Sequence, residues 1–411
     1  MEFSKYNPET DRDACRRIWN ETGWLDLDEE IPLKGFDSIL KSGRAWTAKI
    51  NGEPECLVLT ASGSMCYQDE EISFSGVSGV TTSRIARKQG FAGRLTAHAV
   101  AHDAADGFAL SGLGMFEQGF YDKLGFGSGN YIHWMGFDPQ MLTVPYATRP
   151  PARLTYKDAE KIHASRIASM KHHGKLTFES IDITLCEQCD SPKGFGLGYF
   201  NDDGDLTHHI WFSDSKKEHG PYTIVWMSWQ STEEFLELMG ILRNIGDQVR
   251  LVQLIEPAGI QLQDLLRGPL QQQMITRGGN YPQANYGLAE WQIRINDLNE
   301  CIGKTHLTCE SFSFNLEVND PIEKYLDKNA AWKGVTGSYT VTLGQESSIK
   351  KGTDASLPVL KTSINAFSRM WLGCRPASGL AVTAGIDASP ELITQLDGAF
   401  RLPAPHRYWE F

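Results

Sequence analysis

The chain has 411 residues, a formal charge of −12 and 41% hydrophobic residues. This length predicts two or three domains, each able to bury its own core. The acidic balance, without a long basic run, argues against a nucleic-acid surface, which needs Lys and Arg at the phosphates. No apolar run matches a bilayer span and the N-terminus lacks a signal-peptide core, so we expect a cytosolic protein without membrane insertion.

The eight cysteines are scattered along the chain. Only Cys186 and Cys189 have the spacing of metal ligands, and no second Cys or His pair follows nearby. Such a pair makes half a zinc site at best. We therefore expect reduced thiols and no metal.

The first elements expected along the chain are a helix over 11–20, an acidic loop and a hairpin. The loop collects the carboxylates Asp26, Asp28, Glu29 and Glu30. Such a run is usually a solvated face, but Asp26 is a candidate for binding a cationic substrate if the loop walls a pocket. Strands over 45–50 and 56–61 flank Asn51-Gly52, the sequence of a tight hairpin turn.

The most specific pattern lies in residues 72–107. Residues 72–82 read as a strand whose glycines, including Gly79, predict bulges and room for a ligand. The turn Arg87-Lys88-Gln89-Gly90-Phe91-Ala92 is an instance of Arg/Gln-x-x-Gly-x-Gly/Ala, and a helix is expected from Phe91 until Gly107. Amides at such a helix start converge on one point that suits a pyrophosphate. The same pattern also fits an ordinary strand-to-helix turn.

The next strand, expected over 108–113, is followed by a segment that contains a tyrosine. Tyr121 stands ahead of a Leu-Gly-Phe-Gly turn that ends at Gly127. A lone Tyr is usually a half-buried core residue. Its place one strand beyond the glycine turn makes its hydroxyl a candidate proton donor.

These two segments resemble a known family. Residues 72–107 resemble the acyl-CoA site of the GCN5-related N-acetyltransferases (GNATs). The tyrosine segment is similar to that of the enhanced intracellular survival (Eis) family, whose pattern is Ser-Glu-x-x-Ile-Tyr-Gly-Arg-Phe-Gly-Tyr-Gly. The sequence keeps the family's residues at Glu117, Tyr121, Gly125 and Gly127, and it has Phe116 where a small Ser is usual.

The resemblance implies an α/β (α+β) chain of two tandem GNAT-like domains followed by a sterol-carrier-like α/β domain. The expected domains are 1–150 with the acetyl-CoA site, 151–288 without it, and 289–411. Prolines 145, 150 and 151 mark the first boundary. In the second domain a capping pattern at Ser231 opens a helix with Glu233 and Glu234, which would repel phosphate.

The sequence of the last third of the chain predicts two half-buried strands and a helix. Alternating apolar residues at 312–318 and 339–343 indicate the strands. Ser389 as cap and Pro390 in the first turn open a helix that runs to about Phe400. This combination resembles the sterol-carrier-like domain that closes Eis-family chains.

The C-terminal segment reads as a stiff arm. Pro403 and Pro405 hold it extended, so eleven residues reach roughly 35 Å at most. By itself it would be a frayed terminus. Its ending Glu410-Phe411 matches the family's Glu-Phe terminus, whose free carboxylate enters the first domain's active site.

The resemblance also implies the roles of the site. Acetyl-CoA is the co-substrate, Tyr121 the general acid, and the Phe411 carboxylate the general base; Asp26 and Glu410 supply negative potential for a cationic amine. The residues expected to bind acetyl-CoA are Val80, Thr81, Thr82, Arg87, Lys88, Gln89, Gly90, Phe91, Ala92, Gly93, Phe116 and Glu117. The acceptor is an aminoglycoside- or polyamine-like molecule or a protein lysine, and a homohexamer is expected. The alternative is a non-catalytic acyl-CoA- or lipid-binding protein with a decayed pocket.

Overall fold

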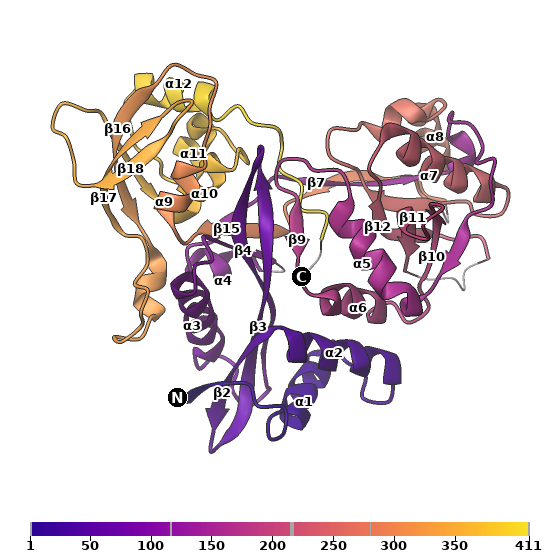
Figure 1. Ribbon diagram of the computed structural model, residues 1–411, viewed down its shortest axis with the longest axis horizontal. Helices are drawn as coiled ribbons and strands as arrows, with labels where there is room; N and C mark the ends of the chain where they lie inside the picture. The colour runs from indigo at the N-terminus through magenta and orange to yellow at the C-terminus, as the bar shows by residue number, and fades with distance from the viewer. Residues whose placement is uncertain (1, 116, 214–217, 280, 410–411) are drawn as a thin grey trace.

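The computed structural model describes residues 2–115, 117–213, 218–279 and 281–409, and it contains three β-sheets flanked by helices (Figure 1). We call the parts of the chain built around these sheets the first, second and third domains. In Figure 1 the first domain lies between the other two, and the C-terminal segment runs from the third domain to β9, where the Leu176 amide donates to the Arg407 carbonyl. The mixed α/β fold predicted from the sequence is confirmed.

The first domain contains an eight-stranded sheet in the order β1-β2-β3-β4-β5-β15-β6, with β9 pairing with β3. Its strands are β1 (Glu2–Lys5), β2 (Arg44–Ile50), β3 (Glu53–Tyr67), β4 (Glu70–Thr82), β5 (Leu110–Gly114), β6 (Gly127–Ser128), β9 (Leu176–Phe178) and β15 (Trp291–Ile295). Its helices are α1 (Arg12–Thr22), α2 (Glu30–Ser42), α3 (Phe91–Ala105) and α4 (Gln118–Asp122). The predicted hairpin turn is present, because Asn51 and Gly52 both have a left-handed φ between β2 and β3.

The second domain contains a seven-stranded sheet in the order β14-β7-β13-β12-β11-β10-β8. Its strands are β7 (Ile132–Phe137), β8 (Ala152–Leu154), β10 (Phe195–Phe200), β11 (Leu206–Phe212), β12 (Tyr222–Ser228), β13 (Val252–Ile255) and β14 (Asn285–Leu288). Its helices are α5 (Ala159–Ala168), α6 (Ile181–Cys189), α7 (Thr232–Asn244) and α8 (Pro269–Thr276). The Ser231 hydroxyl accepts from the Glu234 amide, so the predicted cap of α7 is present.

Strand exchange joins the first two domains. β7 follows β6 directly but pairs with β13 and β14 of the second sheet. β15 returns to the first sheet and lies between β5 and β6, while β9 pairs with β3. The first two sheets are therefore not confined to the expected domains, residues 1–150 and 151–288. A strand's pattern shows which faces are buried but not which sheet accepts its backbone, so this exchange has no local signal.

The third domain contains a four-stranded sheet in the order β18-β17-β16-β19. Its strands are β16 (Phe312–Asn319), β17 (Gly337–Leu343), β18 (Ser348–Lys351) and β19 (Val359–Ser363). Its helices are α9 (Leu298–Gly303), α10 (Ile364–Trp371), α11 (Ala377–Thr383) and α12 (Pro390–Ala399). Ser389 caps α12 through the Leu392 amide, as predicted.

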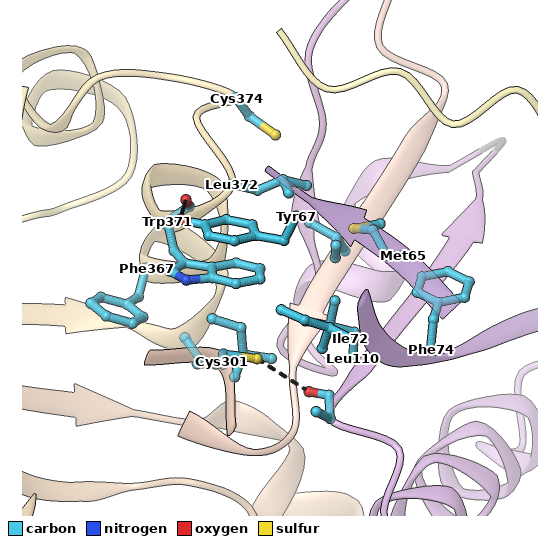
Figure 2. Packing of buried hydrophobic residues seen from close by; sticks show 14 of the residues in the cluster. Met65, Tyr67, Ile72, Phe74, Leu110, Cys301, Phe367, Trp371, Leu372 and Cys374 are labelled. Atoms are coloured by element: carbon cyan, nitrogen blue, oxygen red, sulfur yellow. Dashed lines mark hydrogen bonds between the residues drawn. The ribbon is translucent and has the colours of Figure 1, made fainter. Parts of the chain in front are cut away.

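One continuous core connects the first and third domains (Figure 2). The ring of Tyr67, at the end of β3, stacks on Trp371 of α10 with 4.2 Å between centroids and 2° between planes. The Tyr67 hydroxyl donates to the Trp371 carbonyl over 3.1 Å. Arg294 of β15 forms a fully buried ion pair with Asp320, 2.7 Å from nitrogen to oxygen. The origin of the C-terminal segment is therefore fixed against the first domain.

Within the described ranges, no helix is both long and apolar enough to cross a bilayer.

Candidate active site

The split between β4 and β5 creates the site. These strands pair in parallel only from Phe74 with Leu110 to Val77 with Leu113. Immediately afterwards β4 bulges, because Gly79 and Val80 together oppose one residue of β3. Gly79 has φ 58°, and a Cβ there would lie 2.7 Å from Leu59 and 2.9 Å from Trp19. The predicted bulge is thus present, and it requires glycine.

The predicted glycine turn connects β4 to α3. Lys88 and Gly90 both have a left-handed φ, and α3 begins at Phe91 as expected. A Cβ at Gly90 would meet no atom within 4 Å, so the backbone there is open to a ligand. The unpaired amides of the first helical turn face the same side as the positive end of the helix dipole. This geometry can hold an anion.

A cavity of about 800 Å³, which we call the turn cavity, lies against this turn. The predicted residues that line it are Val80, Thr81, Thr82, Arg87, Lys88, Gly90, Phe91, Ala92, Gly93, Glu117 and Tyr121. Gln89 does not line it, since its side chain donates to the Ile85 carbonyl. Phe116 lies outside the described residues. Lys123, which the sequence did not single out, adds a third cation to Arg87 and Lys88.

A second cavity of about 640 Å³, the acidic cavity, shares Val80 with the turn cavity. Asp26 and Glu29 line it from the loop after α1, and Asp190 lines it from the end of α6. Trp19 and Trp24 provide aromatic walls, and no Lys or Arg is among the described residues that line it. Carboxylates beside indole rings are suited to an ammonium group.

The sequence did not indicate Asp190, because its position depends on packing between domains. α6 of the second domain lies directly on α2, where Gly35 faces Cys189 so closely that a Cβ would be 2.5 Å from it. The Ser38 hydroxyl also donates to Asp182 at the start of α6. The C-terminal end of α6, a helix of the second domain, thus forms part of the wall of the acidic cavity.

Tyr121 is common to both cavities. It lies on α4, whose first turn is capped by the Glu117 carboxylate accepting from the Gly119 amide over 3.2 Å. Tyr121 is buried, and that burial together with the nearby Glu117 charge raises the pKa of its hydroxyl above the ordinary value. The phenol therefore keeps its proton at neutral pH.

The tail, residues 401–409, runs from the third domain to the junction of the other two. The Leu176 amide of β9 donates to the Arg407 carbonyl over 3.1 Å, and Trp409 is buried. Arg407 pairs with Glu290, whose carbonyl accepts from the Met115 amide on the wall of the acidic cavity. The expected Glu410 and Phe411 lie outside the described residues.

Among the described residues, no group of three or more His, Cys, Asp or Glu side chains is placed to hold a metal ion. Each of the eight cysteines, including Cys186 and Cys189, is free of disulfides.

Comparison with known proteins identifies the part of the chain that carries this site. Residues 5–129 match the family described as an acetyltransferase (GNAT) domain. This segment is a GNAT acetyltransferase domain. The enzyme class that it indicates, as predicted, is that of the N-acetyltransferases. A comparison with curated protein sequences finds no match.

Solved structures share the fold over the whole chain. A conserved protein from Enterococcus faecalis, described as a probable N-acyltransferase, has a TM-score of 0.79 at 17% identity, with 100% of this chain and 99% of that one covered. A GCN5-related N-acetyltransferase from Anabaena variabilis has a TM-score of 0.78 at 15% identity, and Eis1 from Mycobacterium abscessus 0.75 at 16%, both with full coverage of each chain. At these identities the likeness shows the mixed α/β fold that the chains share.

We expect Gly79→Ala to reduce the free energy of unfolding by about 1–3 kcal/mol, because the new methyl group meets two buried side chains at a left-handed φ. Denaturant unfolding measures this change. The matched control is Gly398→Ala, exposed in α12 with no atom near its Cβ, which should be neutral or slightly stabilising. Equal stability of both variants would contradict the role assigned to the bulge.

Proposed function

We propose that this protein transfers an acetyl group from acetyl-CoA to a primary amine of a cationic small molecule of the polyamine or aminoglycoside type. The observation that carries the proposal is the meeting of two oppositely charged cavities at Tyr121. The turn cavity has three cations and one carboxylate, whereas the acidic cavity has three carboxylates and no Lys or Arg among its described lining. A transferase that joins an anionic donor to a cationic acceptor needs a positively charged site for the donor and a separate, negatively charged site for the acceptor.

The residues around the turn fit acetyl-CoA. Left-handed Lys88 and Gly90 open the backbone to a pyrophosphate, and Arg87 and Lys123 add positive charge. The bulged end of β4, from Val80 to Thr82, lines the remaining length of the cavity. Acetyl-CoA supplies a thioester, which an amine can attack once the amine has lost its proton.

The acidic cavity selects the acceptor. Asp26 and Asp190 approach from different domains, so an acceptor with two or more ammonium groups can satisfy both. Trp19 and Trp24 provide ring faces for the alkyl chain or for a further cation. The volume of about 640 Å³ suits a small molecule and favours it over a protein lysine.

Two groups move protons in this proposal. Tyr121 is protonated at neutral pH, lies where the two cavities meet, and gives its proton to the sulfur of the leaving thiolate. The α-carboxylate of Phe411 accepts the proton of the acceptor ammonium, directly or through water, and Glu410 adds negative potential. The pairing of Arg407 with Glu290, whose carbonyl accepts from the Met115 amide on the wall of the acidic cavity, supports this assignment, since two residues beyond Trp409 span at most about 7 Å.

The finer assignment to an Eis-type enzyme, with a sterol-carrier-like third domain and a homohexameric assembly, is part of the same proposal. It is supported by the full-length likeness to Eis1 and by the four-stranded sheet with α10 packed on it. In this arrangement the third domain anchors the tail.

We expect Tyr121→Phe to lower kcat about 100-fold with little change in the KM for acetyl-CoA, because the leaving thiolate loses its proton donor. Thiol release from acetyl-CoA with spermidine, an aminoglycoside, an arylalkylamine and a lysine peptide measures this. Tyr131→Phe is the control, as Tyr131 is exposed outside both cavities. Absence of amine-dependent release by the folded wild type would favour the non-catalytic binding protein.

We expect Asp190→Asn to raise the KM for spermidine about five- to tenfold, and that for a monoamine much less, because only the longer acceptor engages a second carboxylate. Asp26→Asn should behave similarly. Asp28→Asn is the control, since Asp28 lies in the same loop but does not line the cavity. Equal effects on monoamine and triamine would contradict recognition at two points.

A further inference from the structure

The second domain repeats the strand split of the first domain, but the tail lies inside it. β12 and β13 pair in parallel only at Tyr222 with Val252 and Thr223 with Gln253, and then they separate. The remaining space between the two strands is only about 40 Å³. It is lined by side chains of β12 and β13 and by residues 406–409 of the tail. The position that holds a ligand cavity in the first domain is therefore filled by the protein's own chain.

The end of the tail is held by an arginine. Arg166 of α5 is 3% exposed, and its guanidinium lies between two indoles, 3.6 Å from the ring centre of Trp409 and 4.3 Å from that of Trp226. Glu187 accepts from both terminal nitrogens of Arg166, which fixes the plane of the guanidinium. A stack of this kind in a buried site is worth more than one at an exposed site.

The surroundings make this stack rigid. The Trp226 indole N–H donates to Nε2 of His209 over 3.0 Å, and burial lowers the pKa of His209 to about 3, so the imidazole stays neutral. The Trp409 ring also meets Phe178 edge-on, with 5.6 Å between centroids. Phe178 belongs to β9, which pairs with β3 of the first domain. The stack therefore connects the tail to both domains.

A second arginine fixes the backbone of the same residue. Nη1 of Arg407 donates to the Trp409 carbonyl over 3.1 Å, and Nη2 contacts Glu290 at 3.4 Å. The Glu290 carbonyl in turn accepts from the Met115 amide over 2.8 Å, at the wall of the acidic cavity. The ring and the carbonyl of Trp409 are thus both held immediately before the chain's last two residues.

We propose that Arg166 is a positioning residue for acetyl transfer, acting from the second domain by clamping Trp409 so that the C-terminal carboxylate is delivered to the acidic cavity. This inference rests on the proposed function, in which that carboxylate is the base. The second domain then has a defined role in catalysis without binding acetyl-CoA. Its strand split holds a peptide segment in place of a cofactor.

A double-mutant cycle tests the clamp. Arg166→Lys keeps a charge for Glu187 but loses the planar stack, and a chain lacking residues 410–411 loses the base. We expect truncation to lower kcat for spermidine about 100-fold and Arg166→Lys about tenfold, each with an unchanged KM for acetyl-CoA. Combined, the two changes should be no worse than truncation alone, because both act through the same group.

The outcomes separate the two proposals. An unchanged kcat after truncation would overturn the carboxylate base, and the clamp with it. A lowered kcat after truncation, with Arg166→Lys either silent or multiplying the loss, would overturn the clamp alone. Arg243→Lys is the control, because Arg243 also stacks on an aromatic ring, Tyr146, at 4.0 Å but does not contact the tail. Trp409→Ala, which leaves Arg166 paired with Glu187, repeats the test if Arg166→Lys does not fold.

Discussion

The separation of two parallel strands is the constraint on which the rest of the structure depends. β4 and β5 share only four paired positions before the bulge at Gly79 turns β4 away. Both cavities open at that point, and Val80 lines each of them. A strand that stayed paired would bury the backbone that the site needs to expose. In the second domain the same separation occurs between β12 and β13, and there the chain's own tail occupies the space.

Charge is arranged around this split in a way that the overall charge of −12 conceals. Cations lie at the glycine turn, and carboxylates lie beyond Tyr121. Because the effective dielectric constant in a cavity is lower than in bulk water, each charged side chain there favours a ligand of opposite charge more strongly than it would on an open surface. Tyr121 lines both cavities, and its buried hydroxyl keeps its proton at neutral pH.

The second and third domains complete the site from outside. α6 carries Asp190 to the acidic cavity, and the core around Tyr67 and Trp371 fixes the third domain, from which the tail departs. The exchanged strand β15 adds Glu290 just before its first residue, where it meets both Met115 and Arg407. Asp190, Glu290 and the tail each lie more than ninety residues away from the glycine turn in the sequence.

The sequence predicts those features of the site that local physics determines. The glycines of residues 72–82, including Gly79, indicate a bulge, and the glycine turn indicates a helix that begins at Phe91; both are present. The prolines at 403 and 405 predict an extended arm, and residues 401–409 form neither helix nor strand, with a left-handed φ at Tyr408. Asp190 and Lys123 could not be predicted in this way, because their roles depend on packing and not on a local pattern.

The same limit applies to the fold. The acidic run after α1 predicts a loop, yet α2 begins within it at Glu30, because the apolar residues of α2 pack on α6. The partners of β7, β9 and β15 depend on which sheet offers unpaired backbone groups, and no residue pattern within those strands reports that. The position of the tail between β12 and β13 is likewise a property of the assembled chain.

The measurement that tests the central claim most directly is a crystal structure of the protein with CoA and spermidine. The account predicts the pyrophosphate on the amides of residues 88–93, the sulfur beside the Tyr121 hydroxyl, and the spermidine ammonium groups at Asp26 and Asp190. CoA bound away from the glycine turn, or spermidine bound outside the acidic cavity, would contradict it.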